Sequence, residues 1–503
     1  MTSSATLSPA PSRRGVRPDP RLEPVRVKVD RGQRLSLDDG RILLTTPDIW
    51  SVLQLADLVR RRLHANVAFY NVNRHLNYSN VCALSCKFCD FYAKQGQAKA
   101  YTRDMQYVRD EATKAVDAGA TEIHSVGGLH PSLPFSYYTD LVWTIRDQAA
   151  KLGSDLHVKA FTAVEIVHLC KIAKVYKGAS APGEEGRRAR REAIAHVLAK
   201  LKEAGLGSLP GGGAEVFDDR VHDEAFKGKI RSDVWLDVHR VAHELGLNTN
   251  ATLLYGHVER PEDRLVHLDM LRRAQDEALA RLGYASELAP ATGVAGDSRP
   301  SHTELREQQG EFTAADDALT RSEGGHLGYR GDDSAFPVIT LTRPGTPLPE
   351  HVAFAAGHAP QAGYYQTIIP LPFFPDGSEL EHLPGPAGLE NYRTLAVARL
   401  MLDNFPHVKA FWIMQTLPMA QIMLQSGADD IDGTVVWYDI TKLNHAGTVG
   451  GASGNDGVAT HQEVNVWTLQ KAIREAGFIP VERDTLYRRV IRDPSDGRKW
   501  SVA

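Results

Sequence analysis

The chain has few cysteines: four among 503 residues, three of which (Cys82, Cys86 and Cys89) share one short segment. Small secreted proteins that depend on disulfides spread their cysteines along the chain, so this distribution argues against a disulfide framework. Clustered cysteines in a long chain indicate metal or redox chemistry instead. The fourth, Cys170, lies in an apolar helical stretch, where we expect a buried core residue.

The sequence also lacks a long hydrophobic run. No apolar stretch approaches the roughly 18 residues that a membrane-spanning helix needs. The N-terminal segment Met1–Pro24 is rich in Ser, Pro and Arg and lacks the apolar centre of a secretory signal. We therefore predict no membrane span, a cytoplasmic location, and a disordered tail over residues 1–45.

Neither sign of charge dominates. There are 58 basic and 62 acidic residues, which give a net charge of −4. A surface for nucleic acid or for an anionic membrane would need a basic excess. We therefore expect a small-molecule ligand and no nucleic-acid partner.

Short apolar runs alternate with longer amphipathic stretches. Thr46–His64, Val234–Leu245 and Tyr392–Asn404 have the three- and four-residue spacing of helices. Strand–helix alternation predicts an α/β protein with a parallel sheet, and eight strands predict a TIM-like (β/α)8 barrel with its chemistry on the loops after the strands. The eight strand candidates are Val67–Asn73, Thr121–Val126, His157–Thr162, Leu206–Leu209, Asn248–Tyr255, Tyr364–Leu371, Val408–Met414 and Ile431–Val436.

Composition divides the chain further. Residues 46–285 are expected to form the first part of the barrel, and residues 364–503 its remainder together with C-terminal helices. Between them, residues 286–363 are rich in Gly, Ala, Pro, Ser and charged residues and are expected to form a low-complexity insertion. A shorter insertion over residues 178–192 has the charge pattern of a solvated helix start.

The segment 77–91 carries the three clustered cysteines as Cys-x3-Cys-x2-Cys, just after the first predicted strand. Thiolates are the usual ligands of iron–sulfur clusters. Three thiolates on one loop leave one iron of a four-iron cluster without a protein ligand. A zinc site of three cysteines and a histidine is the alternative, but zinc cysteines usually come as pairs separated by a longer gap.

This loop, with Phe88 before the third cysteine, resembles the signature of the radical S-adenosylmethionine (SAM) superfamily. The resemblance implies a [4Fe–4S] cluster on Cys82, Cys86 and Cys89, SAM on the open iron, and a one-electron donor such as flavodoxin or ferredoxin. A tight turn at the glycines and a helix N-terminal acid at Glu165 or Glu215 are the structural alternatives to cofactor binding. The implied cofactor contacts are Phe88, Gly127, Gly128, Glu165, Glu215, Gly256 and Glu259.

Several longer runs resemble the family of aminofutalosine synthases within that superfamily. They are NRHLNYSNVC, SVGGLHPSLPFSYY, HVKAFTAVEI, SLPGGGAEVFDDRV, IIPLPFFPDGSEL and GADDIDGTV, and the usual Ala after the third cysteine is Asp90 here. The resemblance implies a transferase of menaquinone biosynthesis that consumes SAM as a co-substrate. Its 5′-deoxyadenosyl radical adds to the double bond of 3-[(1-carboxyvinyl)oxy]benzoate and gives 6-amino-6-deoxyfutalosine.

The implied substrate carries two carboxylates, so hydrogen-bond donors should face it. Five candidates fall near predicted strand ends, although a lone histidine is often structural. Phe373 and Phe374 are expected to provide apolar walls for the aromatic ring. The five expected substrate contacts are Arg74, His75, His130, Lys159 and His257.

Two other functions remain open from the sequence. The sibling cyclic dehypoxanthine futalosine synthases have the same cysteine loop, but their radical abstracts a hydrogen and free 5′-deoxyadenosine is released. A non-enzymatic iron–sulfur protein, such as an electron carrier or sensor, would need no glycine-lined barrel mouth.

Overall fold

A seven-stranded, entirely parallel sheet forms the centre of the computed structural model, which describes residues 18–181, 183–226, 228–284, 338–355, 362–434 and 463–503. The strands follow one another in chain order around the sheet, as expected for an α/β barrel. The predicted fold class is therefore confirmed. The strands are β2 (Asn73–Leu76), β3 (Glu122–Ser125), β4 (His157–Ala160), β5 (Ser208–Leu209), β6 (Asn248–Tyr255), β7 (Tyr365–Pro372) and β8 (His407–Val408).

A second parallel sheet, in the order β10-β1-β9, adjoins the first. Its strands are β1 (Val67–Asn71), β9 (Asp430–Gly433) and β10 (Ile479–Glu482). An isolated parallel bridge between Lys409 and Asp430 links β9 to the chain leaving β8, and β1 leads into β2 through Val72. The main sheet thus has seven strands, and the eighth predicted strand corresponds to β9.

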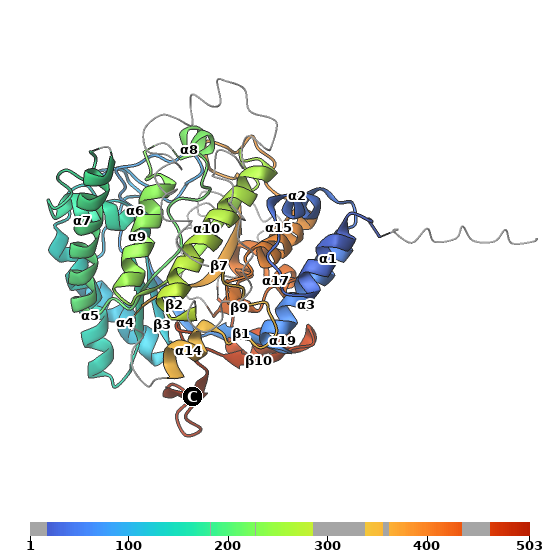
Figure 1. Ribbon diagram of the computed structural model, residues 1–503. Coiled ribbons are helices and arrows are strands. Elements are labelled where there is room, and N and C mark those ends of the chain that lie inside the picture. Colours follow the sequence, from blue (N-terminus) through green and yellow to red (C-terminus); the bar gives the residue numbers. More distant parts are fainter. Residues whose placement is uncertain (1–17, 182, 227, 285–337, 356–361, 435–462) are drawn as a thin grey trace, which may run out of the picture.

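Helices surround the sheet (Figure 1). In α4, Asp104 caps the N-terminus by accepting from the backbone N–H of Tyr107 at 2.8 Å, and Val108, Ala112 and Ala115 are buried on one face. This three- and four-residue spacing fixes which side faces the strands. The helices after successive strands are α4 (Met105–Asp117), α5 (Phe135–Lys151), α6 (Ala163–Ile172), α7 (Gly183–Ala204), α8 (Asp219–Ala225), α9 (Ser232–Glu244), α10 (Pro261–Arg281), α15 (Gly388–Met401), α16 (Trp412–Gln415) and α17 (Leu417–Met423).

The prediction of a disordered tail over residues 1–45 is wrong for residues 18–45, which the structure describes as folded. Two helices, α1 (Leu22–Asp30) and α2 (Leu37–Thr45), precede α3 (Ile49–His64) and lie together on one side of the molecule (Figure 1). Val25 and Leu43 are fully buried against the main core. Hydrophobic burial therefore orders this region, and residues 1–17 lie outside the described residues.

Part of the predicted insertion over residues 286–363 is folded, so the insertion is shorter than predicted at its C-terminal end. Its positions 286–337 and 356–361 lie outside the described part of the chain, but residues 338–355 belong to the folded body and end in α14 (Pro349–Ala355). Leu341 is buried and donates its backbone N–H to the carbonyl of Asp403 at 2.9 Å. Residues 183–192 of the shorter segment form the first part of α7.

The described C-terminal region consists of one helix followed by three strands that the sequence did not predict. After α19 (Val466–Glu475) come β10, β11 (Val490–Arg492) and β12 (Trp500–Val502). Strand β10 pairs with β1, with Val67 opposite Ile479. Strand β10 therefore completes the small sheet beside the first strand of the chain, and β11 and β12 form a separate antiparallel pair.

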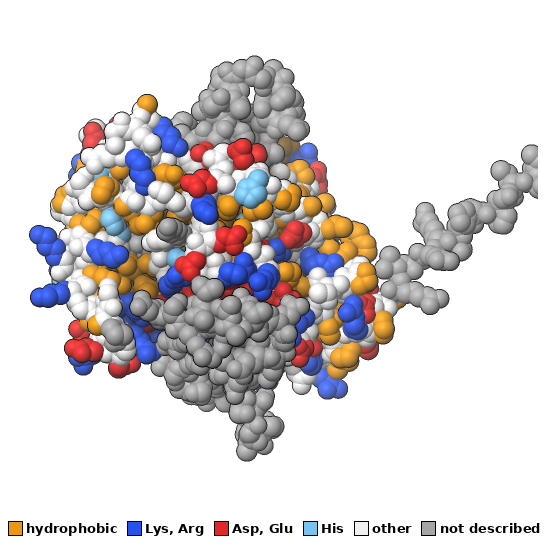
Figure 2. Space-filling model, turned by 90° about the horizontal axis from the view of Figure 1, so that it is seen from above, with side chains coloured by type: hydrophobic (Ala, Val, Ile, Leu, Met, Phe, Trp, Pro, Cys, Tyr) orange, Lys and Arg blue, Asp and Glu red, His pale blue; other side chains and the backbone are white. Residues whose placement is uncertain are grey.

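The surface shows no single-sign field on the face visible in Figure 2. Basic and acidic side chains are mixed with hydrophobic ones wherever described atoms are exposed there. Among the described helices, none is long and apolar enough to cross a bilayer.

Candidate active site

A cavity of about 380 Å³ opens among the loops that follow the strands. Its lining includes the three clustered cysteines, the predicted glycines Gly127 and Gly128, the glycines 211–213 after β5, and polar side chains from within the strands. A TIM-like barrel carries its chemistry at this end, so the cavity is the candidate active site.

Cys82, Cys86 and Cys89 all line this cavity as free thiols. Burial is the main reason that the pKa of Cys86 rises to about 11, and burial also raises the pKa of Cys89. Desolvated thiols become thiolates when a metal takes the place of the proton. The donor set therefore fits an iron–sulfur cluster, which needs buried thiolates.

The backbone of the cysteine loop is held by Lys94. Its ammonium donates to the carbonyl oxygens of Cys82, Ala83 and Leu84 at 3.0, 3.2 and 2.7 Å. The Cys82 backbone N–H also donates to the carbonyl of Ala93 at 3.0 Å. One side chain thus fixes three consecutive peptide groups at the first cysteine, a role that the sequence did not reveal.

Gly127 and Gly128 pack closely against the start of the cysteine loop. The Gly128 N–H donates to the carbonyl of Ser79 at 2.8 Å. A β-carbon at Gly128 would lie 2.3 Å from the carbonyl oxygen of Val81, and one at Gly127 would lie 2.6 Å from the ring of Tyr78. Only glycine permits this approach, because it has no β-carbon.

Glu165 lines the cavity, but its carboxylate is fully engaged by the protein. Its two oxygens accept four hydrogen bonds: one from the Tyr78 hydroxyl (2.7 Å), one from the Gly127 N–H (3.1 Å), and two from the N–H (2.8 Å) and hydroxyl (2.7 Å) of Thr162. A carboxylate offers about four acceptor sites. Glu165 therefore positions the glycine segment, and its predicted contact with the cofactor stays a prediction.

Glu215 and Phe88 both contact Lys229, next to the cysteines. Glu215 lines the cavity in a left-handed conformation, with φ +60°, and forms an ion pair with Lys229. The Lys229 ammonium lies 4.6 Å from the centre of the Phe88 ring, and Phe226 packs edge-on against that ring at 5.0 Å. Both predicted residues thus face the cavity that holds the cysteines.

Gly256, His257 and Glu259 do not line the cavity, contrary to their predicted roles. Glu259 is buried and accepts the N–H groups of Gly256 and His257 at 2.6 and 2.9 Å. It also accepts from Arg264 at 2.8 Å. Through these contacts the Glu259 carboxylate stabilises the turn after β6.

Of the five predicted substrate contacts, only His75 and Lys159 line the cavity. Arg74 points the other way and donates to Glu111 at 2.7 Å, because neighbouring residues of a strand face opposite sides. His130 lies outside the lining, where its carbonyl accepts from His168 at 2.9 Å. Phe373 and Phe374 do form part of the wall.

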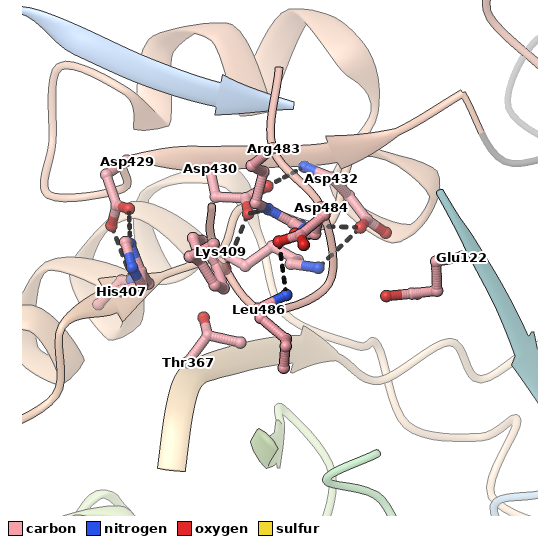
Figure 3. Close-up of polar contacts among 12 residues, drawn as sticks. Glu122, Thr367, His407, Lys409, Asp429, Asp430, Asp432, Arg483, Asp484 and Leu486 are labelled. Carbon is pink, nitrogen blue, oxygen red and sulfur yellow. Dashed lines mark hydrogen bonds and ion pairs between the residues drawn. The ribbon is translucent and has the colours of Figure 1, made fainter. Parts of the chain in front are cut away.

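The strands also contribute cavity residues that sequence reasoning missed. Glu122 and His124 alternate on β3, Lys409 follows β8, and Asp432 lies within β9; both β8 and β9 are short strands that carried little signal. Figure 3 shows Lys409 next to Asp432, and Glu122 to the right of this pair. The alternation on β3 was a usable signal, since every second residue of a strand faces the same side.

Comparisons with known proteins agree with this geometry. Residues 76–271 match the family model of the radical SAM superfamily, and residues 362–494 match that of the CofH/MqnC C-terminal region. The chain is 34% identical over 481 residues to the aminodeoxyfutalosine synthase of Thermus thermophilus, which covers 95% of this chain and 98% of that relative. It is 33% identical to the same enzyme of Streptomyces coelicolor, over 94% and 96% of the two chains.

A solved structure with the same fold is that of methylornithine synthase. It is 15% identical, with a TM-score of 0.51 over 91% of this chain and 97% of that one. At this identity the likeness concerns the fold alone.

Proposed function

Because the chain belongs to the radical SAM superfamily and, within it, to the aminodeoxyfutalosine synthase family, we propose that it joins the 5′-deoxyadenosyl group of SAM to 3-[(1-carboxyvinyl)oxy]benzoate. A new carbon–carbon bond forms, the aryl group migrates, and one carboxylate is lost, so that the product is 6-amino-6-deoxyfutalosine, an intermediate of menaquinone biosynthesis. The observation that carries this proposal is the set of three free thiols on one loop, lining one cavity with the glycine segment beside them.

Cys82, Cys86 and Cys89 would hold a [4Fe–4S] cluster, with SAM completing its coordination. When bound, the cluster supplies the electron that cleaves SAM into methionine and the 5′-deoxyadenosyl radical. The protein contributes position and exclusion of water. Lys94 and Gly128 fix the cysteine loop, and these contacts need no cluster to form.

The remaining cavity residues divide between the two substrates. The backbone of Gly127 and Gly128 is suited to the methionine ammonium of SAM, and Glu215 stands next to the cysteines, where a ribose hydroxyl or an ammonium would be bound. His75 and Lys159 are suited to the anionic substrate. Phe373 would cover its aromatic ring.

The test is reconstitution of the protein with iron and sulfide under anaerobic conditions. SAM, dithionite and the enolpyruvyl benzoate are added, and products are analysed by mass spectrometry. We expect an adduct with the mass of aminodeoxyfutalosine, which Cys86→Ala abolishes. Cys170→Ala is the matched control, because that cysteine is buried and lies outside the cavity lining.

Free 5′-deoxyadenosine without the adduct would reject the synthase and favour the sibling cyclase. Failure to bind any iron–sulfur cluster would refute both. In a cytoplasmic setting we propose that a flavodoxin or ferredoxin replaces dithionite, and the same assay with either donor tests this.

A further inference from the structure

Two lysines are held inside the cavity by carboxylates. The Lys159 ammonium donates to Glu122 at 2.7 Å, and the Lys409 ammonium donates to Asp432 at 2.7 Å. Both lysines are 4% exposed and line the cavity. An ammonium group has three hydrogens, and these contacts use one on each lysine.

Lys409 is placed by a chain of contacts that begins in the C-terminal strand region. The guanidinium of Arg483 and the hydroxyl of Tyr487 donate to one oxygen of Asp430, at 2.6 and 2.8 Å. The other oxygen accepts the backbone N–H of Asp432 at 2.6 Å. Figure 3 shows Arg483, Asp430, Asp432 and Lys409 together.

Asp432 has an unfavourable backbone conformation, with φ +72°. Non-glycine residues persist in the left-handed region only where their surroundings enforce it, and such residues are frequent at functional sites. The hydrogen bond from Asp432 to Asp430 supplies this enforcement and aims the Asp432 carboxylate at Lys409.

The neighbouring strands add polar groups to the same region. His75, His124 and Lys159 are register partners on β2, β3 and β4, and the rings of the two histidines lie 4.6 Å apart. The Nε2 atom of His124 is buried and has no hydrogen-bond partner among the described residues. A buried polar atom in this state requires a partner such as a water or a ligand group, and this one lines the cavity.

The positions of these groups define the orientation of the ligand. Lys159 and Lys409 project from strands or directly beside them, whereas the cysteines stand on the loop beyond β2. The third lysine of the described lining, Lys229, is paired with Glu215 next to the cysteines. When the vinyl group lies on the side of the cysteines, the opposite end of the cavity, with Lys159 and Lys409, is left for the ring.

We infer that Lys409, together with Lys159, binds the ring carboxylate of the benzoate substrate, and that Arg483 is a positioning residue acting through Asp430 and Asp432. This inference rests on the proposed function and deepens it. The C-terminal region thereby helps to determine specificity for a carboxylated ring, although Arg483 itself does not line the cavity.

The test compares two ligands on the reconstituted enzyme with SAM and without reductant, so that no turnover occurs. Anaerobic calorimetry measures the Kd of the full substrate and of 2-phenoxyprop-2-enoate, which lacks the ring carboxylate. Lys409→Met should weaken binding of the full substrate by about 10- to 100-fold, as for a lost charge-assisted hydrogen bond. It should leave the Kd of the phenoxy analogue unchanged.

Two further variants sharpen the comparison. Arg483→Met should weaken binding of the full substrate in the same selective way, because Asp430 loses the donor through which it positions Asp432 and Lys409. Lys114→Met is the matched control, since Lys114 pairs with Glu111 on α4 and its side chain is 59% exposed outside the cavity. It should change neither Kd.

An unchanged Kd in Lys409→Met would overturn the inference, and so would an equal loss for both ligands. A different result would refute the proposed function without refuting this inference. If the wild type binds the substrate selectively but forms no aminodeoxyfutalosine after reduction, the carboxylate site stands and the assigned reaction is wrong.

Discussion

Lys94 offers the sharpest test of how the cysteine loop is held. Lys94→Met keeps most of the apolar stem but removes three hydrogen bonds to the carbonyls of Cys82, Ala83 and Leu84. A hydrogen bond from a charged donor contributes roughly 1.5–3 kcal/mol when buried, and solvent reaches part of this site. We therefore estimate a total loss of about 2 kcal/mol, which corresponds to about 30-fold weaker retention of the cluster.

The assay is anaerobic transfer of iron from the reconstituted protein to a chelator, followed by the loss of cluster absorbance. Lys87→Met is the matched control: it lies on the same loop, and its ammonium makes no hydrogen bond or ion pair with the described residues. We expect fast loss in Lys94→Met and wild-type behaviour in the control. Equal rates in all three proteins would refute the reasoning, because the loop would then be ordered without Lys94.

Three other predictions concern the site and the core. Gly128→Ala should prevent stable cluster assembly, because its β-carbon would lie 2.3 Å from the carbonyl oxygen of Val81; iron content measures this. Glu165→Ala should raise the Kd of SAM about 10-fold by releasing Gly127, as measured by calorimetry, with cluster content unchanged. Burial lowers the pKa of His267 from 6.5 to about 3. The unfolded chain therefore binds a proton that the folded chain excludes, and stability falls as pH drops below 6.5. By pH 5, this histidine should remove about 2 kcal/mol of the unfolding free energy, and urea melts at pH 7 and pH 5 should show a smaller difference in His267→Gln.

Local patterns predicted the elements that carry their own signal. Strand β6 has the predicted bounds, Asn248–Tyr255, and helix α3 starts three residues after its predicted beginning. Hydrophobic periodicity is visible within one element, and so is the spacing of three cysteines on one loop. Neither depends on residues far away in the sequence.

The direction of a side chain was harder to predict. Arg74 and His75 are adjacent, yet only His75 faces the cavity. The first predicted strand, Val67–Asn73, is divided at Val72 into β1 and β2, which belong to different sheets. Because the period of a strand is two residues, this boundary decides which residues of NRHL face inward.

The partners of the acidic residues were beyond local patterns. In the sequence, a glutamate that binds a ribose at a strand end cannot be distinguished from one that stabilises a turn. Glu259 is occupied by Arg264 and two backbone N–H groups, and Asp430 by Arg483, which lies 53 residues away in the sequence. Composition and spacing do not tell whether such a carboxylate is occupied by neighbours in the turn, as for Glu259, or by a distant residue, as for Asp430.

The N-terminal helices show why composition misled there. Helices α1 and α2 have nine residues each, a length at which an isolated helix is only marginally stable in water. A local signal did exist, because Ser36 and Asp39 form a capping box at the start of α2. The decisive contacts are tertiary: Arg34 binds Asp276 at 2.6 Å and Asp403 at 2.9 Å. The segment 22–45 is therefore held in place by acids more than 200 residues away, and only the folded barrel brings those acids to it.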